Sequence, residues 1–124
     1  MKDYKEPEVW QKGVTLATSL YDVSRGFPDT EKFGLTTQVR RAATSVPANI
    51  AEGWGRGSTK EYVQFLHVAR GSLLELETHL IIADRLGYLS RERFAEAQKT
   101  IESIGMMLNR LITALKARQS QPTK

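Results

Sequence analysis

The sequence predicts an all-α fold, an antiparallel up-and-down four-helix bundle. Apolar residues recur at steps of three and four in four segments, residues 8–25, 35–54, 59–87 and 91–118, as they do in helices with one buried face. The links between these segments are short, so consecutive helices are expected to be antiparallel neighbours. No segment alternates apolar and polar residues as a strand does. Residues 1–118 are therefore predicted to form one domain and residues 119–124 a disordered tail.

The first two predicted helices differ in how well their sequences suit a helix. Residues 8–25 carry a regular apolar stripe of Trp10, Val14, Ala17, Tyr21 and Ser24, broadened by Leu16 and Leu20. In residues 35–54 the stripe is Leu35, Val39, Ala42 or Ala43, Val46 and Ile50. Pro47 lies inside this second helix, where proline costs about 3 kcal/mol. Because the stripe continues in phase beyond Pro47, we expect a kinked single helix rather than two short pieces.

The last two predicted helices have the strongest signals. In residues 59–87 the stripe is Tyr62, Leu66, Ala69, Leu73, Leu76, Leu80, Ala83 and Gly87. Ser58 and Glu61 have the spacing of a capping box, and Gly87 is the expected stop. In residues 91–118 the stripe is Phe94, Ala97, Ile101, Ile104, Leu108, Leu111 and Leu115, with Ser90 as the expected N-cap. Gly71 weakens the third helix, which predicts that another helix crosses closely at that point.

Composition places limits on the kind of protein. The chain has 124 residues, no cysteine and a net charge of +4, so disulfides and thiolate zinc sites are excluded. The N-terminus lacks the apolar region of a signal peptide, and no apolar run is long enough to span a bilayer. We therefore expect a cytoplasmic protein with no membrane partner. Residues 32–70 and 90–124 each carry a net charge of +4, whereas residues 1–31 and 71–89 each carry −2, which favours an anionic partner.

No constellation of residues predicts catalysis. The glycine-rich run at residues 53–57 follows a helix and lacks the Lys-Ser/Thr ending of a phosphate loop, so it is interpreted as a linker. His67 and His79 are far apart on one predicted helix and have no Glu-x-x-His companion, which argues against a metal centre. The sequence therefore predicts a protein that is not an enzyme and that has no cofactor, metal or small-molecule substrate.

A polar stripe of amides, hydroxyls and arginine runs along the second predicted helix. Such groups suit hydrogen-bonded burial, and Arg41 is well suited to pair with Glu75 or Glu77 on the next helix. If that carboxylate is buried, removing Arg41 should cost about 3–5 kcal/mol. The predicted internal network is Gln38, Arg41, Ser45, Asn49, Glu52, Glu75 and Glu77. A surface for RNA or a ligand, and plain exposure to solvent, remain the alternatives.

Two blocks of sequence resemble a known family. The run RRAATSVPANIAEG at residues 40–53 resembles the proline-containing signature of the bacterial four-helix bundle proteins, also called 23S rRNA intervening-sequence proteins. The run FLHVARGSLLELET at residues 65–78, followed by LGYL at 86–89, is similar to a second block of that family. The resemblance covers residues 8–116. It implies a four-helix bundle that assembles as a ring-shaped homopentamer, and it implies similarity to the accessory variability protein of diversity-generating retroelements, a basic pentameric barrel that binds nucleic acid and a reverse transcriptase.

These observations together predict an oligomeric, non-enzymatic bundle that binds structured RNA or a nucleoprotein partner through basic surfaces. The candidate phosphate-binding residues are Arg40, Arg56, Lys60, Arg70, Arg110, Lys116 and Arg118. The apolar stripes on all four helices present more apolar surface than the core of one bundle can bury, which predicts a homo-oligomer. The alternative is a purely structural or protein–protein interaction module that does not bind nucleic acid.

Overall fold

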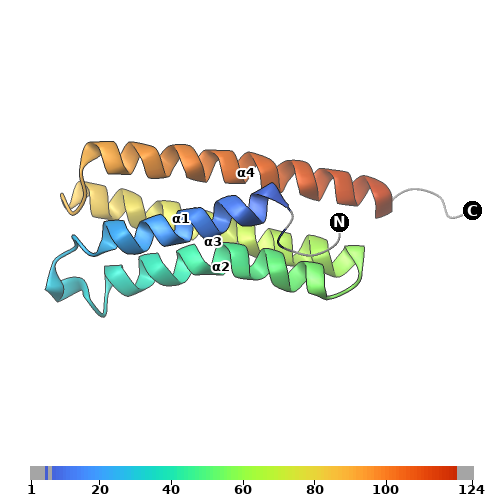
Figure 1. Ribbon diagram of the computed structural model, residues 1–124, viewed down its shortest axis with the longest axis horizontal. Helices are drawn as coiled ribbons and strands as arrows, with labels where there is room; N and C mark the ends of the chain where they lie inside the picture. The colour runs from blue at the N-terminus through green and yellow to red at the C-terminus, as the bar shows by residue number, and fades with distance from the viewer. Residues whose placement is uncertain (1–4, 6, 120–124) are drawn as a thin grey trace, which may run out of the picture.

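The protein folds as a bundle of four helices. A computed structural model describes Lys5 and residues 7–119. The helices are α1 (Glu8–Ser24), α2 (Leu35–Gly55), α3 (Thr59–Arg85) and α4 (Arg91–Gln119), with a short 3₁₀ helix, η1 (Asp29–Glu31), before α2. Successive helices run antiparallel, and each packs against its two neighbours in the cyclic order α1–α2–α3–α4 (Figure 1). The predicted up-and-down bundle is confirmed, and the predicted tail lies outside the described residues except for Gln119, which ends α4.

The signals at the ends of α3 and α4 act as the sequence predicts. Ser58 Oγ accepts a hydrogen bond from the backbone N–H of Glu61 at 3.2 Å, and Ser90 Oγ accepts one from the N–H of Arg93 at 3.1 Å. Gly87 has φ of +75°, in the left-handed region that glycine adopts freely. The following N–H, from Tyr88, donates to the carbonyl of Ala83 at 2.9 Å, which closes α3 with a Schellman motif.

One continuous apolar core runs along the axis of the bundle. The predicted stripes of α2, α3 and α4 point largely inward, whereas Val14 and Tyr21 of the predicted α1 stripe are exposed and Leu16 and Leu20 are buried in their place. The fully buried large side chains come from all four helices: Leu16, Leu20, Val39, Val46, Ile50, Leu66, Leu76, Leu80, Ile104 and Leu108. Trp10, Trp54 and Phe94 are half-buried and pack against the edge of this core. Burial of apolar area on this scale is the main source of stability in a domain of this size.

Helices α2 and α3 share the largest interface because small residues let their backbones approach. A Cβ on Gly53 would lie 2.7 Å from Phe65 Cβ and 3.2 Å from the carbonyl oxygen of Tyr62. Gly71, which the sequence suggested as the close crossing, has nothing within 4 Å of where its Cβ would be, so that prediction is wrong. Gly71 faces away from the interface, whereas the adjacent Ser72 meets Ser45 of α2 with 2.8 Å between the hydroxyl oxygens.

Pro47 does not break α2, which runs without interruption from Leu35 to Gly55. The ring of Pro47 is buried against α1, and a Cβ on Gly13 would lie 3.3 Å from Pro47 Cβ. Glycine at this point therefore makes room for the proline ring. The prediction of a single helix rather than two pieces is confirmed.

The two ends of the bundle are built differently. At the end where α1 leads into α2, Glu31 accepts a hydrogen bond from Tyr88 Oη at 2.9 Å and another from the backbone N–H of Leu35 at 3.1 Å. This carboxylate ties η1 to the start of α2 and to the α3–α4 link. At the other end, α1 begins well short of the last turns of α4, so among the described helices α2, α3 and α4 extend furthest at that end (Figure 1).

Candidate nucleic-acid interface and assembly surfaces

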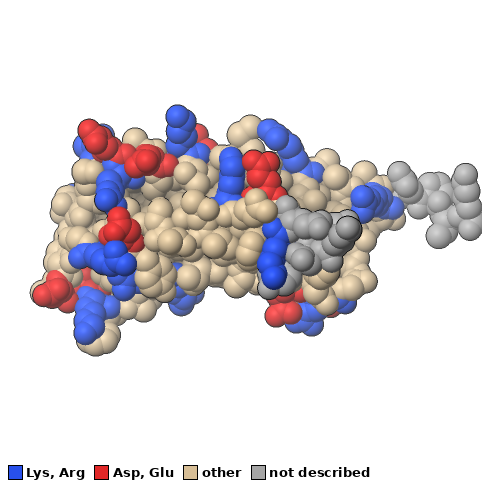
Figure 2. All heavy atoms as spheres, in the orientation of Figure 1, with Lys and Arg blue, Asp and Glu red and all other residues tan. Residues whose placement is uncertain are grey.

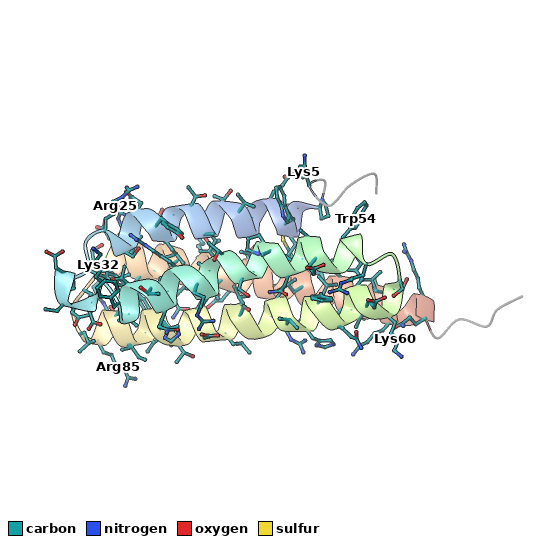
Figure 3. The ribbon with its side chains drawn as sticks, turned by 90° about the horizontal axis from the view of Figure 1, so that it is seen from below. Lys5, Arg25, Lys32, Trp54, Lys60 and Arg85 are labelled. Atoms are coloured by element: carbon teal, nitrogen blue, oxygen red, sulfur yellow. The ribbon has the colours of Figure 1, made fainter. Side chains whose placement is uncertain are left out.

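Positive charge gathers in one half of the bundle. A plane across the helices beside the Ser45–Ser72 contact separates residues 5, 7–15, 46–70 and 104–119, here called the basic half, from residues 16–45 and 71–103. The basic half carries eight cationic and three acidic side chains, a net charge of +5, and the remaining half carries −1. Lys5, Trp54 and Lys60 mark the basic end in Figure 3, and Arg25, Lys32 and Arg85 mark the opposite end.

Several cations of the basic half have no carboxylate partner within the described part of the chain. Lys60, Arg110 and Arg118 are exposed, and none of them forms an ion pair there. Arg70 bonds only to neutral partners: Nη1 donates to Asn109 Oδ1 at 2.8 Å, and Nη2 lies 2.9 Å from His67 Nδ1. The acidic residues of this half pair with cations other than these four: Glu8 with Lys12, and Glu52 and Glu61 with Arg56. The four cations Lys60, Arg70, Arg110 and Arg118 therefore keep their charge open to an external anion.

In the opposite half, four of the six arginines form ion pairs with carboxylates of the described residues. Arg25 pairs with Asp22 at 2.8 Å, and Arg93 of α4 reaches across to the same carboxylate at 2.9 Å. Arg91 pairs with Asp84 at 3.0 Å, and Arg41 pairs with Glu75. On the face that Figure 2 shows, acidic side chains gather toward this end of the molecule. The two halves thus differ mainly in net charge, because the opposite half has more acidic side chains than the basic half.

His67 lies close to positive charges of the basic half, which affect its pKa. Partial burial holds the pKa of this imidazole below its ordinary value, and the neighbouring Arg70 and Lys116 lower the pKa further. A protonated imidazole would add a third positive charge to this group, and repulsion between like charges opposes that protonation. The side chain is therefore placed where a bound phosphate would change its protonation.

Six of the seven candidate phosphate-binding residues lie in the basic half. The seventh, Arg40, lies in the other half and is engaged in structure. Its Nε donates to Ser24 Oγ at 2.8 Å, and its guanidinium lies 4.7 Å from the centre of the Tyr21 ring. Arg56 is placed in the basic half but is held by Glu52 and Glu61 and lies 4.8 Å from the centre of the Phe65 ring. Arg40 and Arg56 therefore act first as links between helices.

Two cations of the basic half, Lys5 and Lys12, were not among the candidates predicted from the sequence. They belong to a segment whose summed charge is negative, and three of its six acidic residues, Asp22, Asp29 and Glu31, lie in the other half, at or beyond the far end of α1. Lys12 Nζ lies 3.9 Å from Glu8 and donates to Ser103 Oγ of α4 at 3.1 Å. The direction of α1 in the predicted bundle was the signal that could have separated the lysines from those acids.

Part of the predicted polar network is present between α2 and α3. Arg41 Nη2 donates to Glu75 and to Gln38 Oε1, the latter at 2.7 Å. Asn49 Nδ2 donates to the Ser45 carbonyl and hydroxyl oxygens at 2.8 and 2.9 Å. His79 Nε2 lies 3.4 Å from Glu75 Oε1, and hydrogen bonds from His79 and Arg41 lower the pKa of that carboxyl.

Three expectations for this network were wrong. The Arg41 and Glu75 side chains are 57% and 39% exposed, so the ion pair lies at the surface and not in the interior. Glu52 belongs instead to the basic half, where it pairs with Arg56 at 3.3 Å. Glu77 lies on the other side of α3, beside α4, because residues two apart on a helix point to different faces.

Two apolar grooves lie on opposite sides of the bundle. The groove between α1 and α2 has a volume of about 390 Å³ and exposes Val14 and Tyr21 above Pro47. The groove between α3 and α4 has a volume of about 520 Å³ and exposes Leu74, beside Gly105. Figure 2 shows an uncharged band along the middle of one face of the molecule. Exposed apolar surface of this kind is typical of contacts between subunits.

Two other features, a metal centre and a membrane-spanning helix, are absent from the described residues. No three His, Cys, Asp or Glu side chains among them are grouped so as to hold a metal ion. None of the helices in that part of the chain is long and apolar enough to cross a membrane.

Comparison with known proteins agrees with this architecture. Curated protein sequences give no match. A crystal structure of a protein of unknown function from the S23 ribosomal protein family of Bacteroides thetaiotaomicron VPI-5482 superposes with a TM-score of 0.78. The alignment has 24% sequence identity and covers 84% of this chain and 97% of that one, so the likeness is one of fold. The sequence model of the 23S rRNA-intervening sequence protein family matches residues 5–110, which include the whole of α1, α2 and α3. The chain therefore belongs to that family.

Proposed function

We propose that this protein binds structured RNA through the basic half of its bundle and is not an enzyme. The observation that carries the proposal is the group Lys60, Arg70, Arg110 and Arg118, four cations in one half of the molecule that no described carboxylate neutralises. Phosphate groups are the ligands that such cations bind without sequence preference. Membership of a family named for an insertion in ribosomal RNA favours RNA as the source of the phosphates.

The proposed binding unit is a homo-oligomer. The α1–α2 groove and the α3–α4 groove lie on opposite sides of the subunit, so the first groove of one copy can contact the second groove of the next. Such head-to-tail contacts produce a ring when the rotation closes. The family resemblance makes five copies the expected number. A ring would repeat the basic half of each subunit around one rim, and the phosphate contacts of the subunits would add.

The experiment is RNA filter binding over a salt series, with a matched pair of triple variants. K60A/R110A/R118A removes three cations of the basic half, and K32A/R85A/K99A removes three exposed cations of the other half. For wild type, five to ten phosphate contacts predict a loss of affinity of about 10³-fold or more between 50 and 200 mM salt. The basic-half variant should bind at least about tenfold more weakly with a shallower salt slope, and the control variant should bind like wild type.

Equal losses in the two variants would mean that net charge, and not the basic half, governs binding. No binding at 50 mM salt would contradict the proposal. It would leave the second candidate function, a structural or protein–protein interaction module, which the two apolar grooves favour independently of charge.

A further inference from the structure

Arg70 is held in place by two uncharged partners, one on its own helix and one on the next. Its Nη1 donates to Oδ1 of Asn109 on α4 at 2.8 Å, and its Nη2 lies 2.9 Å from Nδ1 of His67, one turn earlier on α3. A guanidinium has five N–H groups, and these two contacts leave three of them without a partner among the described residues. The side chain is therefore fixed in position while its charge and most of its donors remain available to an external acceptor.

The contact with Arg70 also determines which ring nitrogen of His67 carries the hydrogen. Arginine donates hydrogen bonds and cannot accept them, so Nδ1 of His67 accepts and the hydrogen of the neutral ring lies on Nε2. Partial burial, together with the charges of Arg70 and Lys116, holds the pKa of this imidazole below its ordinary value, so the ring is neutral at neutral pH. Nε2 of His67 and Nε of Arg70 lack a partner in the described part of the chain, and neither is buried, so solvent reaches both. The two side chains thus present adjacent, accessible N–H donors.

Positive charge collects around this pair without a carboxylate to neutralise it. Arg70 forms no ion pair with any described acidic residue, and Lys116 of α4 is near enough for its charge to affect His67. Glu77 and Glu102 line the groove between α3 and α4 that Arg70 also lines, but each lies about two turns along its helix from this site. The surplus of charge suits an anion that carries more than one negative charge.

The number of donors and the surplus charge together define the ligand. A phosphate monoester carries a charge close to −2 at neutral pH and has three strong acceptor oxygens. A phosphate inside an RNA chain carries a single negative charge and has two oxygens that are not part of the chain. The monoester therefore fits the site better, and in RNA a phosphate monoester occurs at the end of a strand.

We propose that Arg70 and His67 bind the terminal phosphate of an RNA strand, an inference that rests on the proposed function. Arg70 donates to two of the phosphate oxygens, as an arginine fork does, and Nε2 of His67 donates to the third. Asn109 is a positioning residue, because it orients the guanidinium without neutralising it. The basic half then supplies affinity for any RNA, and this site adds a preference for strands that end in a phosphate.

The experiment compares three single-stranded RNA probes of one sequence at 50 mM salt, with a 5′-phosphate, with a 3′-phosphate or with neither. Wild type should bind at least one phosphorylated probe about tenfold more tightly than the unphosphorylated one, the effect of one added charge-assisted hydrogen bond. Asn109→Asp, which keeps the shape of the side chain and pairs Arg70 with a carboxylate, should abolish this preference. Gln64→Glu is the matched control, because it adds the same charge at an exposed position of α3 in the basic half and should keep the preference. Arg70→Lys, which keeps the charge and lacks the planar fork, should reduce the preference.

Inorganic phosphate tests the same site without RNA. The chain has two histidines, so in NMR spectra at constant pH and ionic strength the imidazole signals of His67 report on the site and those of His79 serve as the internal control. Phosphate should shift the His67 signals to saturation and leave those of His79 in place, and Asn109→Asp should remove the shift. Phosphate that shifts neither histidine, or both alike, would overturn the site.

The RNA probes separate this inference from the proposed function. Equal affinity of wild type for all three probes, or a preference that survives Asn109→Asp, would overturn the terminal-phosphate site and leave RNA binding by the basic half intact. Failure of wild type to bind any of the probes would overturn both proposals.

Discussion

Gly53 lies directly against Phe65 across the α2–α3 interface, at a separation that leaves no room for a side chain. A methyl group on Gly53 would sit 2.7 Å from Phe65 Cβ, and neither position can yield without moving a helix backbone. The absence of a single carbon atom therefore determines how closely the two helices pack. The Ser45–Ser72 hydrogen bond and the Arg41–Glu75 ion pair lie further along the same interface and depend on that spacing.

Gly53→Ala is expected to destabilise the fold by about 1–3 kcal/mol, the usual cost of overpacking a tight contact. Gly55→Ala is the matched control, because nothing lies within 4 Å of a Cβ at that position, also in α2. The control should change the free energy of unfolding by less than about 1 kcal/mol, in the stabilising direction. Urea unfolding measures both. Equal midpoints for the two variants would show that α2 and α3 separate at little cost.

Arg41→Ala is expected to cost less than about 1 kcal/mol, because its ion pair with Glu75 is exposed at the surface. This is well below the cost that a buried pair would incur. Lys116→Ala, on an exposed part of α4, should cost less than about 0.5 kcal/mol. The measurement is urea unfolding of both variants at neutral pH. A loss above about 3 kcal/mol for Arg41→Ala would indicate that the carboxylate is buried.

Asp22→Asn should make the free energy of unfolding less dependent on pH in the acidic range. A hydrogen bond from Arg93, together with the charges of Arg93 and Arg25, holds the pKa of Asp22 below its ordinary value. A lowered folded-state pKa contributes stability above the unfolded-state value, and that contribution is lost as pH falls through the folded-state pKa. Wild type should therefore lose stability below about pH 4, and Asp22→Asn should lose less over the same range.

Urea midpoints between pH 3 and pH 7 test this expectation. Asp29→Asn is the control, because Asp29 forms no ion pair within the described residues and should leave the wild-type slope unchanged. An Asp22→Asn variant with the same acid sensitivity as wild type would mean that Arg93 does not bind this carboxylate in solution.

RNA binding should tighten by a few-fold as pH falls from 7.5 to 5.5, through protonation of His67. The pKa of His67 is lowered by burial and by Arg70 and Lys116, and a phosphate bound to those cations would raise it again. The complex then holds more protons than the free protein, so affinity rises as pH falls through the bound-state pKa and levels off below the free-state pKa.

His67→Gln should abolish this pH dependence, and His79→Gln should retain it. His79 lies 3.4 Å from Glu75, in the half of the molecule that carries no surplus of positive charge. Filter binding at constant ionic strength measures both variants. Affinity that is independent of pH in wild type would place the phosphates away from His67 and Arg70.

Leu74→Glu should dissociate the oligomer. Leu74 is 59% exposed at the α3–α4 groove, and a carboxylate there would have to lose its hydration in an apolar contact between subunits. Light scattering at micromolar concentration should give a multiple of 14.0 kDa for wild type and one chain for the variant. Phe33→Glu is the control, since Phe33 is 89% exposed outside both grooves. A wild-type mass of one chain would refute the proposed homo-oligomer.

The fold was predictable because its signals are local. Apolar spacing identifies the buried faces of α2, α3 and α4, and Ser58, Ser90 and Gly87 each act within their own helix end. In α1 the predicted stripe includes Val14 and Tyr21, which are exposed. The close contact was not predictable, because Gly53 and Gly71 both lie in helices and only the register of α2 on α3 distinguishes them. The same register decides that Arg41 meets Glu75 at the surface.

The basic half was only partly predictable, for a geometric reason. Three of the four segments whose charge was summed, residues 1–31, 32–70 and 90–124, contain a helix that crosses both halves, so their sums mix the two ends. The net −2 of residues 1–31 conceals Lys5 and Lys12, which lie with the basic half, behind Asp22 and other acids at the far end. The sequence also does not show which arginines form ion pairs. Arg93 and Arg110 both lie on α4, and they differ in whether another helix places a carboxylate beside them.

The unequal interfaces of the bundle also set the order in which it opens. Helices α2 and α3 share the largest interface and α1 and α4 the smallest, so local unfolding begins along the α1–α4 seam and reaches the α2–α3 hairpin last. Backbone amides of α2 and α3 near Ser45 and Ser72 should therefore be the slowest to exchange with deuterium. The two glycines that bring backbones together, Gly13 and Gly53, both lie on α2 contacts, which makes the second helix the element around which the others assemble.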